Sequence, residues 1–479
     1  MSENSIANPS PKVAIIGGGI SGLATAFFLS RKGLRPTLIE KTSRLGGLIK
    51  TDLAGGCELE AGPDSFIAAK PAVAELAAEL GIENRIIGSN DERRRIFIKR
   101  GGKLVQLPQG MAMMVPGNLR AAFQSRLFGA RTKLRFLREI VSAPRPREAD
   151  ISIQDFVLDH FSAEMLWYVT EPLLTGVYGG DSAHLSAASV LPRFLEYELK
   201  YGSLIRGVRS EQARTSAQKG GLFRSFSGGM QTLVDGLARE IDGRVDLRTE
   251  EATAVTRTAT GWNVLCANES VTADHVVLAC PAHVNSRLLE ASAPELSSRL
   301  AAIPYTSAIL VTLVYERSEL DHPLDGFGFL VPRLERQAIA AATWVSTKFP
   351  SRAPANRAVL RAFIVGDQAA ALIDSSDDEL TGLARGEFRR TMGIHPAPLF
   401  STVYRWPKSM PQYVVGHAKW RNAVMAGLSQ TPGLHLCGNA YDGIGIPDCV
   451  RLARQTADLI ANELSRKGEG NFTTASSSN

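Results

Sequence analysis

The stretch that decides the fold lies near the start of the chain and reads Lys12-Val-Ala-Ile-Ile-Gly-Gly-Gly-Ile-Ser-Gly-Leu-Ala-Thr-Ala-Phe-Phe-Leu-Ser-Arg-Lys-Gly-Leu-Arg-Pro-Thr-Leu-Ile-Glu40. The apolar run at 13–16 predicts a buried parallel strand, which the glycines turn into a helix that ends near Arg31. A second strand is expected at 37–40. The stretch therefore predicts one βαβ unit.

The glycine pattern within this unit, Gly17-x-Gly19-x-x-Gly22, is typical of dinucleotide binding. Gly17 permits the tight turn, Gly19 lets a pyrophosphate approach the backbone, and Gly22 lets the helix lie close to the strand. The pyrophosphate would then lie at the positive helix N-terminus. Glu40 ends the second strand, where a carboxylate can accept hydrogen bonds from ribose hydroxyls. The alternative is an ordinary βα turn with Glu40 in a surface ion pair.

Length and composition indicate a globular enzyme of two or three domains, because 479 residues with 44% apolar content form a large core. No apolar run approaches 18 residues, and the polar segment 1–11 does not resemble a signal peptide. We therefore expect a cytoplasmic protein. Its five cysteines are never spaced as Cys-x-x-Cys, which argues against a disulfide framework, a redox-active disulfide and a zinc site. The sequence predicts no metal site.

Basic residues concentrate between Arg93 and Arg147, where fourteen Lys and Arg oppose the single acid Glu139 and give a local charge of +13. The formal total is only +6, so the rest of the chain is net acidic. Such a region needs an anionic counterpart, either a lipid surface or an acidic small molecule. Aromatic residues do not alternate with the charges, so nucleic acid is not expected.

A basic amphipathic helix is expected within this region. Apolar residues recur at helical spacing from Leu119 to Val141, after a possible Gly117-Asn118 cap. The pattern fits a membrane-surface element, and it fits equally a solvated face of a helical domain.

The order of patterns predicts an α/β plus α+β fold with a Rossmann-like domain, a substrate domain and a helical insertion. The expected boundaries are as follows: residues 1–88, 217–285 and 434–466 form the discontinuous nucleotide domain, 89–216 the basic helical insertion, 286–433 an antiparallel sheet with a helix, and 467–479 a disordered tail.

Further motifs extend along nearly the whole chain: Gly17 to Gly22, Arg44-Leu-Gly-Gly47, Gly62-Pro-Asp-Ser-Phe66, Gly176-Val-Tyr-Gly-Gly-Asp181, Gly228-Gly-Met-Gln-Thr-Leu233, Arg405-Trp-Pro-Lys-Ser-Met-Pro-Gln-Tyr-Val-Val-Gly-His417 and Gly443-Ile-Gly-Ile-Pro-Asp-Cys449. Together they resemble the flavin-dependent porphyrinogen oxidases, a branch of the monoamine oxidase-like superfamily. The resemblance implies FAD as the cofactor, a substrate domain, and a helical domain that contacts membrane in relatives.

The resemblance also implies roles for individual residues. It assigns Gly17, Gly19, Ser21 and Gly22 to the pyrophosphate, Glu40 to the ribose, Val255 to adenine, Arg44, Gly47, Gly62, Pro63, Asp64 and Ser65 to the ribityl chain and flavin, Trp406 to the flavin surroundings, and Ile444, Gly445, Ile446 and Asp448 to the closing loop. Arg95 resembles the arginine that pairs with a substrate propionate, and Gly176 the glycine that faces the macrocycle; Asp64 is the third expected substrate-binding residue.

The chemistry of a porphyrinogen agrees with these features, because an apolar macrocycle with carboxylate arms needs an apolar slot and rim arginines. The chain has neither a second nucleotide motif nor a cysteine pair to pass electrons on. Dioxygen is therefore the expected acceptor, with hydrogen peroxide as product. The sequence identifies no general acid or base, and His417 fits a structural role as well as a functional one.

Asp64 and the segment Ile446-Pro447-Asp448 resemble the bacterial branch that oxidises coproporphyrinogen III. The protoporphyrinogen IX branch more often has Asn at the position of Asp64 and, with a shift in the loop, at that of Pro447. Coproporphyrinogen III is the favoured substrate and protoporphyrinogen IX the alternative. More distant possibilities are another FAD amine oxidase or desaturase, and a non-enzymatic escort protein that has lost its flavin. The sequence leaves both monomer and homodimer open.

Overall fold

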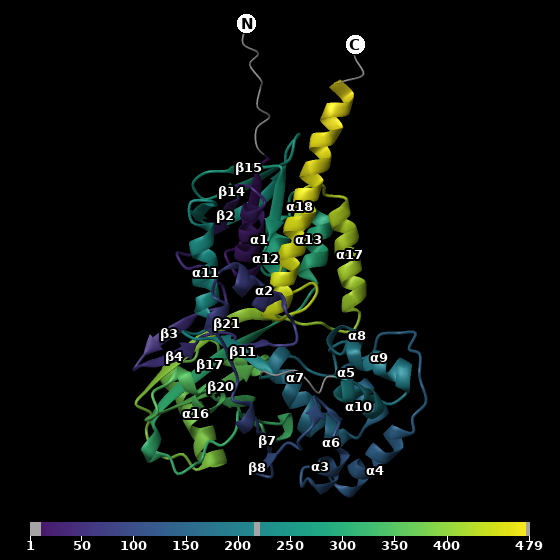
Figure 1. Cartoon of the computed structure of the whole chain (residues 1–479), viewed down its shortest axis with the longest axis vertical. Helices are drawn as coiled ribbons and strands as arrows, with labels where there is room; N and C mark the ends of the chain where they lie inside the picture. The colour runs from purple at the N-terminus through teal and green to yellow at the C-terminus, as the bar shows by residue number, and fades with distance from the viewer. Residues whose placement is uncertain (1–10, 215–220, 476–479) are drawn as a thin grey trace.

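The structure, a computed structural model, describes residues 11–214 and 221–475. Figure 1 shows a nucleotide-type lobe at the top, a large sheet with its helices at the lower left, and a group of helices at the lower right. The predicted mixed α/β and α+β class is confirmed.

A five-stranded parallel sheet forms the centre of the upper lobe. Its strands follow the order β12 (Asp246–Thr249), β2 (Thr37–Glu40), β1 (Val13–Ile16), β16 (His275–Leu278) and β22 (Leu434–Leu436). The predicted βαβ unit is confirmed, since helix α1 (Ile20–Arg31) connects β1 to β2 and the two strands pair in parallel. Strand β16 flanks β1 on its other side, so distant parts of the chain share one sheet.

Helix α1 is the core helix of this lobe. Its residues 21–29 are all buried, which is typical of a helix covered on every side. It packs against α18 (Ile446–Ala475) and α11 (Gln231–Ile241). Three further helices, α12 (Ala282–Leu288), α13 (Pro294–Ala301) and α17 (His417–Ser429), and a small antiparallel sheet of β13 (Ala252–Arg257), β14 (Trp262–Cys266) and β15 (Val271–Ala273) complete the lobe.

A seven-stranded sheet forms the second body. Its order is β21 (Phe400–Pro411), β17 (Tyr305–Glu316), β20 (Arg357–Val365), β19 (Ala341–Trp344), β18 (Gly328–Leu330), β7 (Ile96–Arg100) and β8 (Lys103–Gln106). Side chains alternate along β20: Leu360 and Ala362 pack toward helix α16 (Asp377–Met392), while Val359 packs with the hairpin β3 (Thr51–Ala54) and β4 (Cys57–Glu60). Helices α14 (Val345–Lys348) and α15 (Asp367–Leu372) lie between these strands in sequence.

The sequence grouped 89–106 with the helical insertion, and the structure corrects this. Strand β7 pairs in parallel with β18, and β8 pairs with β7 at the edge of the large sheet. The sequence does not show which sheet these strands join; in the fold Ile98 is buried and the Phe97 ring lies 5.5 Å from the Trp344 ring.

The third body consists of short helices: α3 (Leu119–Gln124), α4 (Ala130–Ile140), α5 (Ile153–His160), α6 (Ala163–Met165), a π-helical segment (Leu166–Thr170), α7 (Glu171–Tyr178), α8 (Ala187–Val190), α9 (Pro192–Tyr201) and α10 (Leu204–Arg214). The helix expected from Leu119 to Val141 is in fact two helices. Asn118 caps the first as predicted, but the chain then turns Leu127 and Phe128 into the core before Gly129 starts the second.

The remaining elements are short. Strands β5 (Phe66–Ile67), β11 (Phe223–Phe226) and β6 (Ile86–Gly88) form a three-stranded sheet beside helix α2 (Ala72–Glu79). Strands β9 (Met111–Ala112) and β10 (Val115–Pro116) form a separate pair.

The tail expected to be disordered from 467 is helical as far as Ala475, because α18 continues past its packed part; residues 476–479 lie outside the described chain. Figure 1 shows this end of α18 extending beyond the upper lobe. Among the described residues, no helix has both the length and the apolar character needed to cross a membrane.

Candidate active site

The first glycine loop connects β1 to α1 at the carboxyl edge of the parallel sheet. Gly17 has φ +106°, and a Cβ on Gly22 would lie 1.9 Å from the Gly17 carbonyl oxygen, so neither position admits a side chain. Helix α1 begins at Ile20 with Gly19 as its N-cap residue, and none of the described side chains caps it. Its first backbone N–H groups therefore form a site suited to a phosphate.

The second glycine loop, 44–49, packs directly on the first. The Gly46 N–H donates to the Gly18 carbonyl over 2.8 Å, and a Cβ on Gly47 would lie 3.1 Å from the Gly19 Cα. Arg44 donates its guanidinium N–H groups to three carbonyls of its own loop, those of Leu45, Gly47 and Ile49. Arg44 thus shapes the loop, and the two loops pack closely because neither Gly19 nor Gly47 carries a side chain.

Glu40 lies at the end of β2, beside the first loop. One carboxylate oxygen accepts the Gly18 N–H over 2.7 Å, and the other accepts the Thr42 N–H over 3.0 Å and its hydroxyl over 2.9 Å. These bonds fix the carboxylate at the edge of the phosphate site, which is the place where a ribose hydroxyl of a bound dinucleotide would be recognised.

The segment 62–65 lies over the second loop. A Cβ on Gly62 would lie 1.8 Å from the Leu48 carbonyl oxygen, so this close approach requires glycine. The Trp406 indole of β21 donates to the Ala61 carbonyl over 2.6 Å, and Arg361 of β20 donates to the Gly62 carbonyl. The large sheet thereby supports the cofactor-binding loops from below.

A buried group of charged side chains holds this segment. Lys348 donates to both carboxylate oxygens of Asp64 at 3.0 Å, and Ser65 donates to one of them over 2.6 Å. Arg352 donates to the Asp64 carbonyl over 2.9 Å. Burial alone would raise the pKa of Asp64, but Lys348 and Arg361 hold that pKa well below its ordinary value, so the carboxyl group stays ionised.

The closing loop, 443–448, precedes helix α18. Gly443 has φ +105°, and a Cβ there would lie 2.4 Å from the Asp448 side chain. The Asp448 carboxylate accepts two hydrogen bonds from Lys70, at 2.6 and 2.8 Å. The Tyr413 hydroxyl accepts the Gly443 N–H over 2.8 Å and donates to the Asn439 carbonyl. Packing of α1 against α18 brings this loop to the same end of the lobe as the glycine loops.

Two predicted cofactor residues are positioned differently from the others. Ser21 is 5% exposed, and its side chain hydrogen-bonds the buried Cys449 thiol. Val255 is buried on β13 in the core cluster of Ile39, and its carbonyl accepts the Ser292 hydroxyl. Only the backbone of Ser21 is therefore open to a phosphate.

The predicted substrate residues lie on other elements. Arg95, just before β7, forms a half-exposed ion pair with Asp325. Gly176 lies in α7, although a glycine-rich loop was expected there; the helix continues to Tyr178 and ends at Gly179 with φ +62°. A Cβ on Gly176 would meet no described atom within 4 Å, so this helix face is open. The Tyr178 ring lies 6.2 Å from the ring of Tyr413, whose hydroxyl accepts the Gly443 N–H, so the end of α7 lies near the closing loop. Burial is the main cause that raises the pKa of Tyr178 to about 12.

Sequence reasoning missed the charged side chains that support the loops. These are Lys70, Lys348, Arg352, Arg361 and Glu60, of which Glu60 pairs with Arg352 at 2.8 Å. One signal was available: Arg361 interrupts the apolar strand Ala358–Val365, and a charge inside a buried strand requires a partner. No local signal marks Lys348 or Lys70.

The arrangement as a whole fits FAD. An uncapped helix start suits the pyrophosphate, the paired glycines leave space along its path, and the fixed Glu40 carboxylate suits a ribose. The segment 62–65 lies against the second loop, and packing of α1 on α18 brings the segment 443–448 to the same end of the lobe, so both are candidates for the flavin end of the site.

Comparison with known proteins agrees with this geometry. Residues 20–461 match the family described as flavin containing amine oxidoreductase. A coproporphyrinogen III oxidase of Bacillus subtilis is 30% identical over 91% of this chain and 95% of its own length. The human protoporphyrinogen oxidase is 30% identical over 93% and 97% of the two chains. A crystal structure of an Exiguobacterium protein provisionally named protoporphyrinogen oxidase has a TM-score of 0.85 and 30% identity, and covers 95% of this chain and 99% of its own.

The match spans the first helix, both sheets and the start of the terminal helix. The chain therefore belongs to the flavin-containing amine oxidoreductase family and is an FAD-dependent oxidoreductase.

Proposed function

We propose that this enzyme oxidises a porphyrinogen to the porphyrin in haem biosynthesis, a six-electron reaction in which the electron pairs pass to dioxygen and give hydrogen peroxide. The observation that carries the proposal is the similarity to porphyrinogen oxidases over more than nine-tenths of the chain. When bound, FAD supplies the two-electron acceptor; the protein binds the macrocycle, orients it and excludes water.

Residues of this chain divide the cofactor-binding work. Backbone N–H groups from Gly19 to Gly22 bind the pyrophosphate, Glu40 binds the adenosine ribose, and Gly47 leaves the passage open. The segments 62–65 and 444–448 enclose the flavin end, with Trp406 and Arg361 supporting the first of them. The ion pair of Asp448 with Lys70 fixes the start of α18 beside the site.

On the substrate side, the open face of α7 at Gly176 receives the apolar ring, and Arg95 binds a propionate at the rim. Arg95 and Asp325 are each about 40% exposed, so their ion pair is only weakly stabilising and can be exchanged for a substrate carboxylate. Such an exchange preserves a charge-assisted hydrogen bond to the guanidinium.

Coproporphyrinogen III is the substrate we propose, because Asp64 and the segment 446–448 match the bacterial pattern and a basic rim suits additional carboxylates. Protoporphyrinogen IX is the alternative. The test is anaerobic mixing of the FAD-loaded enzyme with each porphyrinogen and with a primary amine, while flavin absorbance is recorded. Rapid bleaching by coproporphyrinogen III is the expected result. Bleaching by the amine alone would refute the porphyrinogen proposal. Faster bleaching by protoporphyrinogen IX than by coproporphyrinogen III would make protoporphyrinogen IX the substrate.

The Arg95 assignment has its own test. Arg95→Ala is expected to raise KM for the porphyrinogen while the flavin spectrum stays unchanged, because the proposed partner of Arg95 is the substrate and not the flavin. Arg333→Ala, which removes another exposed arginine of an ion pair with Asp181, is the control. An unchanged KM in Arg95→Ala would contradict the role.

We propose that the enzyme is cytoplasmic and binds the membrane surface through helix α4. Leu134, Leu137 and Val141 are 68%, 49% and 77% exposed and recur at helical spacing, with Lys133 and Arg138 beside them. An exposed apolar stripe with flanking bases is typical of a helix in an anionic lipid interface. Leu134→Ser with Leu137→Ser should abolish sedimentation with phosphatidylserine vesicles; Leu53→Ser, at an exposed leucine of β3, should not.

A further inference from the structure

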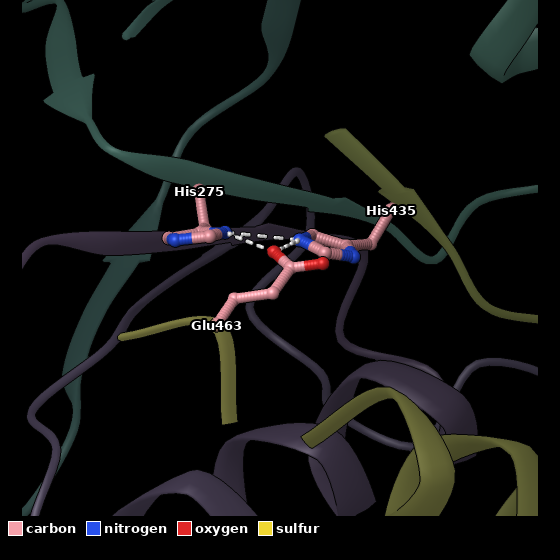
Figure 2. A group of neighbouring side chains, drawn as sticks. All are labelled: His275, His435 and Glu463. Atoms are coloured by element: carbon pink, nitrogen blue, oxygen red, sulfur yellow. Dashed lines mark hydrogen bonds and ion pairs between the residues drawn. The ribbon is translucent and has the colours of Figure 1, made fainter. Parts of the chain in front are cut away.

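Three side chains from distant parts of the chain converge at the amino end of the parallel sheet (Figure 2). His275 is the first residue of β16, His435 lies on the neighbouring β22, and Glu463 reaches them from α18. His275 and His435 are 1% and 5% exposed, whereas the Glu463 side chain is 38% exposed. The group is therefore buried on the side of the sheet and open to solvent on the side of the helix.

The three facing atoms have the spacing of ligands around one ion. His275 Nδ1 lies 3.0 Å from His435 Nε2, and Glu463 Oε2 lies 3.6 Å from the first nitrogen and 3.8 Å from the second. Zinc binds such nitrogen and oxygen atoms at about 2.1 Å, so two ligands at a tetrahedral angle lie about 3.4 Å apart. The observed separations scatter around that value.

We propose that His275, His435 and Glu463 bind one zinc ion that fastens helix α18 to the parallel sheet. Two imidazoles and a carboxylate form a donor set that zinc accepts, with water in the fourth position. Among the described residues, no fourth His, Cys, Asp or Glu joins the group, and the exposed side of Glu463 provides an entry path.

The position of the group gives the ion a structural role. Glycine loops and Glu40 lie at the carboxyl ends of the strands, while His275 and His435 lie toward the amino ends, so the sheet separates the ion from the flavin site. One and two turns before Glu463, Ile460 and Ala457 of α18 pack in the same core cluster as the residues of α1. The ion would continue this attachment toward the end of the helix.

The sequence concealed this group. Its members are separated by 160 and 28 positions, and no short metal motif joins them. The sequence therefore predicted no metal site, because the cysteine spacing on which that expectation rested carries no information about histidines and a carboxylate brought together by the fold. Without metal, the same geometry would be a hydrogen bond between the two imidazoles, in which a proton takes the place of the ion, and this is the alternative that the experiment must separate.

The test uses the tag-free, FAD-loaded full chain, freed of metal with a chelator that is then removed. Zinc titration by calorimetry is expected to give one site per chain, and zinc should raise the melting temperature. Glu463→Gln keeps the fold, because the side chain is partly exposed, and should weaken zinc binding by more than the roughly 10–100-fold that follows loss of an outer-shell partner. His435→Gln should do the same.

Two controls separate this site from adventitious binding. Asp458→Asn alters another acid of α18, one that pairs with Lys32, and His395→Gln alters an exposed histidine; both should bind zinc as the parent does. Turnover should not depend on zinc in any of these proteins. Failure of the parent to bind zinc, or unchanged affinity in Glu463→Gln, would overturn the proposal and leave the hydrogen bond as the correct description, even if His435→Gln does not fold.

Discussion

At the scale of single residues, burial decides which charges matter in this protein. Asp64, in the segment 62–65, and its partners Lys348 and Arg361 are largely buried, so water reaches them poorly. Their partners are other side chains, so each charge depends on its neighbours. Surface pairs such as Lys32 with Asp458 are solvated and nearly independent of their partner.

Removing one member of the buried group should therefore be costly. Lys348→Met is expected to destabilise the holoenzyme by about 3–5 kcal/mol, because it leaves the Asp64 carboxylate buried without its main partner. The control Lys32→Met, in an exposed pair, should lose about 0–1 kcal/mol. Urea unfolding followed by flavin and tryptophan fluorescence measures both. Equal losses of unfolding free energy in the two variants would show that the buried pair stabilises the fold no more than the exposed pair does.

Glu40 supports a prediction about affinity. Glu40→Gln should weaken FAD binding by about 10- to 100-fold, because a hydrogen bond to a charged group contributes about 1.5–3 kcal/mol. Glu269→Gln, which changes an exposed acid 77% open to solvent, should bind FAD like the parent. Flavin fluorescence during reconstitution of the apoprotein gives the two dissociation constants, and equal values would remove Glu40 from the ribose site.

At the scale of elements, buried side chains connect the short helices of the third body. His160 at the end of α5 lies between Glu139 of α4, 3.3 Å away, and Glu198 of α9, 3.1 Å away, and Arg147 also pairs with Glu198. Burial alone would lower the pKa of His160, but the two carboxylates raise it above 6.5. Three helices therefore share one charged centre.

This centre predicts a dependence of stability on pH. Since the folded pKa of His160 exceeds the unfolded value, its contribution is complete below about pH 6.5 and is lost as the pH rises through the folded pKa. The melting temperature of the parent should therefore fall more between about pH 6 and pH 9 than that of His160→Gln. His395→Gln, at an exposed histidine, should behave like the parent. Parallel curves for the parent and His160→Gln would rule out this contribution.

At the scale of the whole molecule, the proposed cofactor site is assembled from both sheets. The parallel sheet provides the glycine loops, and the large sheet supports the segment 62–65 through Trp406 and Arg361. FAD bound along these loops would contact segments that the chain brings together from 17 to 448. Its binding free energy should therefore add to the stability of the whole fold.

Removal of FAD should lower the melting temperature and increase proteolysis. At free FAD about a thousandfold above the dissociation constant, the ligand contributes about 4 kcal/mol. Readdition of FAD should restore the parent value, whereas the same concentration of NAD should not, since the site extends beyond Glu40 toward a flavin. Equal rescue by NAD would contradict the assignment of the segments 62–65 and 443–448 to the flavin.

The sequence by itself determined the local geometry of this protein. Glycines with forced positive φ or no room for a Cβ, such as Gly17 and Gly22, fix the turn, and strand and helix periodicity fix the elements around it. The family motifs then indicated FAD and a porphyrinogen. These features are legible because each depends on residues within one turn or one strand.

Only the tertiary structure decided which distant charges meet. Lys348 reaches Asp64 across 284 positions, Lys70 reaches Asp448 across 378, and His275 meets His435 across 160. The same holds for β7 and β8, whose place in the large sheet depends on pairing with β18. Strand order and helix packing set these contacts, and a buried charge or imidazole takes its role from the partner that the fold places opposite it.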